Sequence, residues 1–181
     1  MTRLTGGTWK GRRLHTLPGL STRPTAAKAR EALFSVLGSR VDGASVLDLF
    51  AGSGALSWEA LSRGAARARL VEKERAATQV LRANRDLLGA TAAEIVPADV
   101  FTYLARAGAE RFDLIFLDPP YRRGLAGQTL DLLKNISLLQ YNGVVVAETE
   151  PEETLDSCLP LELCTVKRYG GVRLWFFQHR A

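Results

Sequence analysis

Residues 45–54 read Ser-Val-Leu-Asp-Leu-Phe-Ala-Gly-Ser-Gly, a mostly apolar run that ends in two glycines. The apolar run is continuous rather than alternating, which is typical of a parallel strand covered on both faces. Residues 54–63 follow it with apolar side chains at helical spacing. The stretch therefore predicts a buried strand that turns sharply into a helix, the first unit of an α/β fold.

The same alternation of strand and helix continues along the chain. After the first unit, strands are predicted over residues 68–72, 93–97, 112–118 and 143–148, and helices over 75–88, 100–107 and 125–139, with a weak helix near 152–158. Two last strands, over 161–169 and 172–178, are joined by Gly170-Gly171, a hairpin signal. Together these elements predict a doubly wound α/β fold with one mostly parallel sheet of seven strands, closed by a C-terminal antiparallel hairpin.

The beginning of the chain has a different pattern. Residues 5–14 suggest two short strands around a glycine turn, and a helix is predicted from Pro24 to residue 38, with Thr25 as a candidate cap. We therefore expect an N-terminal hairpin extension over residues 1–22 and a single domain over residues 23–181, which is long enough to bury a substantial core.

The excess positive charge lies in this first quarter of the chain. Residues 1–40 contain eight basic residues against the single Glu31, a net charge of +7, whereas the whole chain has +5, so residues 41–181 have −2. A basic segment on a near-neutral body is typical of a polyanion-binding attachment, because neutralised phosphates release counterions. A solvated basic tail is the alternative. The residues expected to contact nucleic acid are Arg3, Trp9, Lys10, Arg12, Arg13, Arg23 and Arg30, with Trp9 either packing the hairpin or stacking on a base.

Several classes of protein are disfavoured by composition. No apolar run approaches the roughly 20 residues that span a bilayer, and the N-terminus lacks the apolar stretch of a secretory signal. Cys158 and Cys164 are expected to be plain buried thiols of a cytoplasmic protein, since disulfides are rare in that compartment. His15 and His179 lie far apart in the sequence. A histidine-based metal site and a Ser/His triad are therefore not expected.

The glycine loop, residues 48–54, lies between a strand and a helix, the context that a nucleotide-type loop requires. The dinucleotide fingerprint Gly-x-Gly-x-x-Gly is not met, because its last position is Ser57. Asp48 would repel a pyrophosphate, but it favours a ligand that contains an ammonium and a sulfonium. An ordinary strand-to-helix turn is the alternative interpretation.

Two more acids follow successive strands. Glu72 could accept hydrogen bonds from ribose hydroxyls, or it could simply begin a solvated helix. Asp99 could accept a hydrogen bond from an adenine amino group, or it could cap the next helix.

The strongest chemical motif is Asp118-Pro119-Pro120-Tyr121, which closes the fourth strand. Two consecutive prolines fix their φ angles and remove two N–H donors, which leaves a rigid group of acceptors. The Asp118 carboxylate and the Pro119 carbonyl suit an aromatic amino group with two N–H donors. Tyr121 offers a flat face on which a base can stack, worth about 1–3 kcal/mol. A stiff turn after a buried strand is the alternative.

These motifs, in this order, resemble Rossmann-like methyltransferases that act on amino groups. The N-terminal elements Gly6–Leu14, Arg23-Pro24-Thr25 and Arg30–Phe34 narrow the resemblance to the bacterial RsmD family, small-subunit ribosomal RNA guanine-N2 methyltransferases. The likeness extends over nearly the full length and includes Arg122–Leu125. Tyr121 stands where some members have phenylalanine, and either ring can stack.

The resemblance implies a site for S-adenosylmethionine and for an amino group. It places Asp48, Gly52 and Gly54 at the methionine end of the cofactor, Glu72 at its ribose and Asp99 at its adenine, with Ala51, Lys73 and Val100 beside them. Asp118, Pro119 and Pro120 would orient the target amine and Tyr121 would stack on the guanine. No metal is implied.

The implied substrate is small-subunit ribosomal RNA, either naked or within an assembled or assembling subunit, with its target guanine unpaired or flipped. No obligate protein partner is expected. The alternative is a DNA adenine-N6 or cytosine-N4 amino-methyltransferase, which shares the chemistry. A non-catalytic RNA-binding module would not need residues 118–121, and a nicotinamide oxidoreductase would need the missing third glycine.

Overall fold

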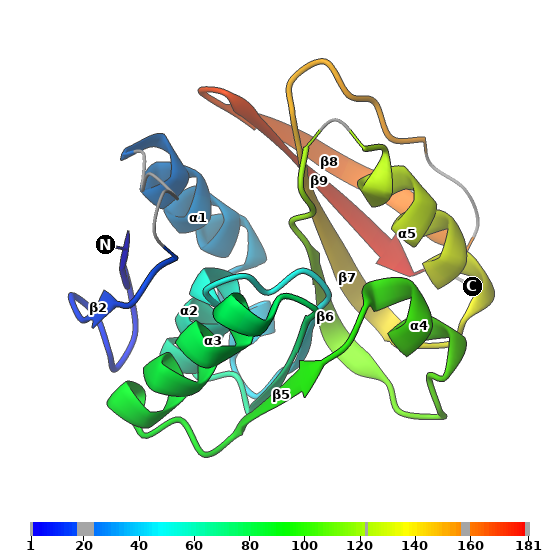
Figure 1. The fold of residues 1–181 in the computed structure, drawn as a ribbon. Helices are drawn as coiled ribbons and strands as arrows, with labels where there is room; N and C mark the ends of the chain where they lie inside the picture. Colours follow the sequence, from blue (N-terminus) through cyan, green and yellow to red (C-terminus); the bar gives the residue numbers. More distant parts are fainter. Residues whose placement is uncertain (1, 18–23, 122, 157–159, 180–181) are drawn as a thin grey trace.

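The structure is a computed structural model that describes residues 2–17, 24–121, 123–156 and 160–179. Seven strands form one mixed sheet in the order β5-β4-β3-β6-β7-β9-β8 (Figure 1). They are β3 (Ser45–Asp48), β4 (Arg67–Glu72), β5 (Ala93–Pro97), β6 (Phe112–Leu117), β7 (Leu139–Thr149), β8 (Leu161–Tyr169) and β9 (Val172–His179). Strands β3 to β7 pair in parallel, and β9 pairs antiparallel with both β7 and β8. The predicted fold class is confirmed.

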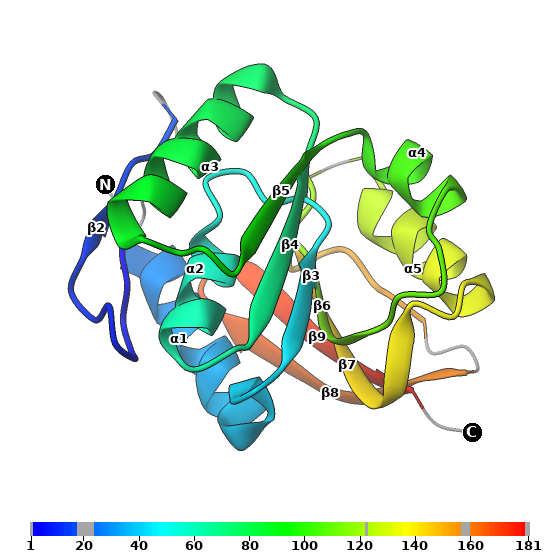
Figure 2. The same ribbon diagram turned by 90° about the horizontal axis from the view of Figure 1, so that it is seen from below.

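Helices cover both faces of the sheet (Figure 2). They are α1 (Pro24–Leu37), α2 (Ala55–Ser62), α3 (Arg75–Leu88), α4 (Val100–Ala105) and α5 (Leu125–Asn135), and a short 3-10 turn, η1 (Gly38–Val41), follows α1. Along each central strand, alternate side chains pack into two separate hydrophobic cores, one on each face of the sheet. On β6, Phe116 packs into the core beneath α1 to α3, whereas Ile115 packs into the core beneath α4 and α5. This burial on both faces explains the continuous apolar runs of the sequence.

The strand order reverses beside β3, and this reversal positions the site. The chain runs outward from β3 through β4 to β5, then returns to the other side of β3 as β6. In doubly wound sheets, ligands bind at such a switch point, outside the carboxyl ends of the strands. Asp48 ends β3 in register with Phe116 of β6, so the glycine loop and residues 118–121 leave the same edge of the sheet.

Several element boundaries differ from the predictions. Strand β7 begins at Leu139 rather than residue 143, and α5 ends at Asn135. The weak helix expected over 152–158 is absent from its described part, since residues 153–156 are irregular and 157–158 lie outside the described residues. Cys164 is exposed on the edge strand β8, contrary to the expectation of a buried thiol; Cys158 lies outside the described residues. No helix in the described ranges is long and apolar enough to span a bilayer.

The N-terminal hairpin is packed firmly onto the domain. Its two strands flank the glycine turn: β2 (Arg13–Leu14) lies inside the predicted residues 5–14, whereas β1 (Thr2–Arg3) lies just before them. Leu4 and Leu14 are buried in the core beneath α1 to α3. Gly7 has φ +73°, and a Cβ there would lie 1.7 Å from the carbonyl oxygen of Ser62 on α2, so only glycine allows this contact. The division of the chain at residue 22 stays a prediction.

A buried carboxylate on α2 holds this hairpin in place. Glu59 is fully buried and accepts hydrogen bonds from the amides of Thr5 (2.9 Å) and Gly6 (2.7 Å). Its oxygens also pair with the guanidinium groups of Arg63 (2.9 Å) and Arg30 (3.3 Å). Burial raises the pKa of Glu59, but the hydrogen bonds from Thr5 and then Arg63, together with the charge of Arg30, outweigh burial and lower the pKa below its usual value. The carboxylate therefore joins the hairpin to α1 and α2.

Candidate active site

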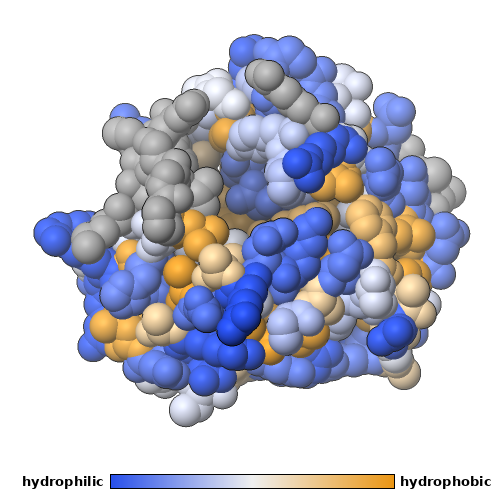
Figure 3. All heavy atoms as spheres, in the orientation of Figure 1, coloured by the Kyte–Doolittle hydropathy of each residue, from blue (hydrophilic) through white to orange (hydrophobic). Residues whose placement is uncertain are grey.

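A cavity of about 700 Å³ lies at the carboxyl ends of the central strands. Figure 3 shows it as a hollow in the face that Figure 1 presents. Ala51, Gly52 and Ser53 of the glycine loop line it on one side, and Asp118 to Tyr121 line it on another. Further lining residues predicted from the sequence are Glu72, Lys73, Asp99 and Val100. The structure thus brings the two principal motifs together around one cavity.

Within the glycine loop, the two glycines have different roles. Gly52 has φ +54° and nothing within 4 Å of the place where a Cβ would lie, so its backbone faces open space. Gly54 has φ +81°, and a Cβ there would lie 2.3 Å from the indole nitrogen of Trp58. Close packing on Trp58 therefore requires glycine at this position, and the expected contact of Gly54 with the cofactor stays a prediction.

Asp48 lies behind the cavity rather than on its wall. The side chain is 1% exposed; its Oδ2 accepts a hydrogen bond from the Ser57 hydroxyl (2.7 Å), and its Oδ1 has no partner among the described residues. Burial raises the pKa of Asp48 to about 7 against the opposing effect of Ser57, and the charge of Glu72 raises it further. Asp48 can thus act on a cationic ligand through its charge, whereas direct contact was expected.

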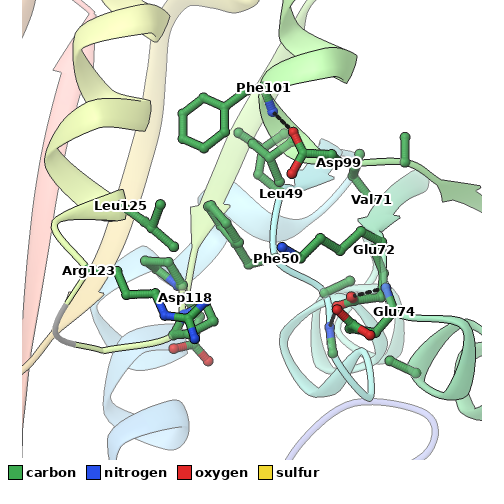
Figure 4. Close-up of a pocket in the computed structure, with 18 of the residues that line it drawn as sticks. Leu49, Phe50, Val71, Glu72, Glu74, Asp99, Phe101, Asp118, Arg123 and Leu125 are labelled. Carbon is green, nitrogen blue, oxygen red and sulfur yellow. Dashed lines mark hydrogen bonds between the residues drawn. The ribbon is translucent and has the colours of Figure 1, made fainter.

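Glu72 and Asp99 occupy the ends of β4 and β5 (Figure 4). The carboxylate of Glu72 accepts hydrogen bonds from the amides of Gly52 (2.8 Å) and Glu74 (2.8 Å), so it fixes the glycine loop against the start of α3. Asp99 caps α4 by accepting hydrogen bonds from the amides of Phe101 (3.0 Å) and Thr102 (3.3 Å) through one oxygen, Oδ1. Both side chains face the cavity and retain lone pairs for a ligand.

An apolar wall of the cavity was missed by the sequence analysis. Its side chains are Leu49, Phe50, Val71, Phe101 and Leu125. Figure 4 shows Phe101 above and Phe50 near the centre, with Glu72 on one side and Asp118 with Arg123 on the other. A flat apolar wall beside carboxylates suits a ligand with an aromatic ring and a polar edge. The available signal was the position of Phe101, two residues after Asp99 at a strand end.

The corner at residues 118–121 lines the cavity, and its acidic residue is Asp118. Burial, then the charges of Glu148 and Asp48, raise the pKa of Asp118 well above its usual value. The residue is exposed by its surface area and lines the cavity. Pro119 is buried, and Tyr121 is 40% exposed, with its hydroxyl bonded to Glu148 (2.8 Å).

The basic residues expected to contact nucleic acid fall into two groups. Arg3, Lys10, Arg12 and Arg13 are exposed on the hairpin. Arg30 is 6% exposed, with its guanidinium bonded to Glu59 and to the carbonyl oxygen of Arg3 (2.5 Å), so the expectation that it contacts RNA is wrong. Trp9 is half-buried against the core, so it packs the hairpin. Arg23 lies outside the described residues.

The described residues contain no group of three or more His, Cys, Asp or Glu that could hold a metal ion. Around the site, Glu72 accepts a hydrogen bond from a backbone amide, and Asp48 and Glu148 each accept one from a hydroxyl group.

Comparisons with known proteins agree with this architecture. The family described as "Conserved hypothetical protein 95" matches residues 2–178. The chain is 41% identical over 153 residues to the ribosomal RNA small subunit methyltransferase D of Escherichia coli, covering 84% of this chain and 77% of that protein. A solved structure, the putative methyltransferase yhhF from Escherichia coli, superposes with a TM-score of 0.90 at 39% identity, covering 99% of this chain and 98% of that one. An RNA methyltransferase from Salinibacter ruber in complex with S-adenosyl-L-homocysteine shares the fold at a TM-score of 0.66 and 15% identity, covering 88% and 94%.

The fold and the cavity, with the glycine loop and the diproline corner on its walls, define a Rossmann-like methyltransferase. The chain belongs to the RsmD family.

Proposed function

We propose that this protein transfers a methyl group from S-adenosylmethionine to the N2 amino group of a guanine in small-subunit ribosomal RNA. The observation that carries the proposal is the shared cavity: the glycine loop and residues 118–121 line one space of about 700 Å³. The Escherichia coli relative, at 41% identity, is a ribosomal RNA small subunit methyltransferase, which supports the RNA substrate.

The residues present fit S-adenosylmethionine. The open space beside Gly52 leaves room for a ligand against the backbone. Glu72 and Asp99 offer acceptors for ribose hydroxyls and an adenine amino group, and the apolar wall with Phe101 suits the adenine ring. The Asp48 carboxyl, with its unpartnered Oδ1, lies behind the loop. A positively charged ligand would favour its ionised form, whereas a pyrophosphate would not. When bound, S-adenosylmethionine supplies an electrophilic methyl group on a sulfonium.

The corner supplies the acceptors for the target amine. The Asp118 carboxylate and the Pro119 carbonyl accept hydrogen bonds from the two N–H groups of the guanine amine. These bonds favour a pyramidal nitrogen, whose lone pair is less delocalised into the ring and can attack the methyl group. Methylation makes the nitrogen cationic, and its proton then leaves to Asp118 or to water. The raised pKa of Asp118 makes this carboxylate a better proton acceptor.

The exposed basic hairpin provides the RNA contact in this proposal. Arg3, Lys10, Arg12 and Arg13 would bind phosphates, and the described body adds no inserted recognition domain. Tyr121, which is 40% exposed, would stack on a guanine that has left its helix. We further propose that the substrate is presented in an assembled or assembling ribosomal subunit in the cytoplasm, without an obligate protein partner.

The test uses labelled S-adenosylmethionine with undermethylated ribosomal RNA, small-subunit particles and DNA in parallel. The modified nucleoside is identified by mass spectrometry. N2-methylguanosine in the RNA is the expected product. N6-methyladenine in DNA would instead establish the alternative amino-methyltransferase, and no transfer to any substrate would overturn the proposal.

A further inference from the structure

Glu148 stands beside the diproline corner and belongs to none of the motifs described above. Leu117 of β6 is in register with Ala147 of β7, so Asp118 and Glu148 are the next residues on two neighbouring strands. Parallel strands lie about 4.8 Å apart. Phe116 and Val146 both point into the core beneath α1 to α3, and the alternation of side chains places Asp118 and Glu148 on that same face.

The Glu148 carboxylate is bonded to the corner through one oxygen. Its Oε1 accepts a hydrogen bond from the Tyr121 hydroxyl at 2.8 Å. No other hydrogen bond or ion pair to Glu148 is found among the described residues, and the side chain is partly exposed, so Oε2 remains able to accept a bond. Burial raises the pKa of Glu148, against the opposing effect of the hydrogen bond from the Tyr121 hydroxyl. When ionised, both oxygens of this carboxylate act only as acceptors.

Two carboxylates side by side match one base better than the others. In guanine, the N2 amino group lies next to N1–H, so the two neighbouring positions are both donors. In adenine and cytosine, the amino group lies next to a ring nitrogen with a lone pair. An acceptor beside the amine-binding group would therefore bond to guanine and face a lone pair in the other two bases.

We propose that Glu148 accepts a hydrogen bond from N1–H of the target base and thereby restricts methyl transfer to guanine. The inference rests on the proposed function, because it assumes that the amine enters between Asp118 and Pro119. Tyr121 is then a positioning residue as well as a stacking face, since its hydroxyl holds Oε1 and leaves Oε2 for the base. The diproline corner selects an amine, and Glu148 selects which base presents it.

The test compares guanine with 2-aminopurine at the nucleotide mapped by mass spectrometry. 2-Aminopurine retains the 2-amino group, but its N1 has a lone pair instead of a hydrogen. Particles containing either base are incubated with labelled S-adenosylmethionine and single-turnover rates are measured. For the unmodified protein we expect guanine to react at least about 100-fold faster, because a site built to bind an N–H discriminates strongly against its loss.

Glu148→Gln and Glu148→Ala are expected to reduce this ratio at least tenfold, by slowing guanine and not 2-aminopurine. The matched control is Glu152→Gln, the same chemical change at an exposed position beyond β7, which should keep the ratio. The affinity of each variant for S-adenosylmethionine shows whether that variant is folded. If Glu148→Ala does not fold, the result with Glu148→Gln decides the test.

An equal loss of rate on both bases in Glu148→Gln would show a purely structural role and overturn the inference. Equal rates for the two bases in the unmodified protein would overturn it as well. Absence of transfer to guanine in the unmodified protein would instead contradict the proposed function, so the two failures are distinguishable.

Discussion

The guanidinium of Arg30 lies 3.3 Å from the carboxylate of Glu59, and both side chains are buried where α1 meets α2. Arg30 also donates to the carbonyl oxygen of Arg3, and Glu59 accepts from the amides of Thr5 and Gly6. One ion pair thus connects two helices to the N-terminal hairpin. The hairpin is thus held against the helices by buried charge as well as by Leu4 and Leu14.

Replacing Glu59 should destabilise the fold. Glu59→Ala leaves the buried Arg30 and two amides without their acceptor, which should cost about 3–5 kcal/mol of unfolding free energy. Urea unfolding at pH 7 measures it, with Glu31→Ala, an exposed acid on α1, as the control. The lowered pKa of Glu59 means that its contribution is present above its usual pKa and is lost as the pH falls. A loss below about 1 kcal/mol in Glu59→Ala, within the usual range for a surface change, would contradict this account.

The exposed charges of the hairpin should act on RNA and not on the cofactor. Lys10→Glu combined with Arg13→Glu should raise the KM for RNA and lower the salt dependence of binding by about one unit of slope per lost phosphate contact. S-Adenosylmethionine affinity should stay unchanged. Arg106→Glu is the control, because this exposed residue follows α4, on the side away from the hairpin (Figure 1). If Arg106→Glu weakened RNA binding as much as the hairpin variant, the effect would come from net charge alone, and a specific RNA contact by the hairpin would be contradicted.

The burial of Asp48 should make stability depend on pH. Its pKa of about 7 exceeds the usual 3.8, so the folded protein retains a proton that the unfolded chain has lost. Stability should therefore fall as the pH rises from about 4 to about 7 and then level off, by at most about 4 kcal/mol from this group. Thermal unfolding of Asp48→Asn across this range should show a flatter curve than the unmodified protein. Parallel curves would show that Asp48 ionises normally in the folded state.

The rate of methyl transfer should fall at low pH, because the corner needs an ionised Asp118. The groups that face it are Glu148 on β7, Asp48 on β3 and Tyr121 in the corner itself, and the two carboxylates raise its pKa. Glu148→Gln removes one like charge, so the normalised single-turnover profile should shift to lower pH. A profile that shifts upward, or does not move, would contradict the coupling between these two acids.

The sequence predicted the sheet and the cavity because both depend on local patterns. Continuous apolar runs, glycine turns and acids at strand ends are features of neighbouring residues, and they located Gly52, Glu72, Asp99 and Asp118 at the cavity correctly. The same reasoning failed for Arg30, because its partner Glu59 lies 29 residues away and only the packing of α1 on α2 brings them together. Glu59, a charge in the middle of the otherwise apolar helix α2 (Ala55–Ser62), was the available sign of that pairing.

Glu148 and Gly54 show the same limit. Glu148 ends an apolar strand, but its position beside Asp118 depends on the register of β6 and β7. At Gly54, the indole of Trp58 occupies the space that a side chain would need, a packing reason for glycine that the sequence did not show. The sequence alone does not show which side chain from another element packs against a given residue.

The most direct test of the account is the single-turnover rate of Asp118→Ala on undermethylated particles, measured together with its S-adenosylmethionine affinity. We expect the rate to fall at least about 100-fold, the scale seen when a positioned acceptor or donor is removed from a reacting group, while cofactor affinity stays within a few-fold. Near-normal turnover in this variant would contradict the claim that the corner at residues 118–121 holds the amine.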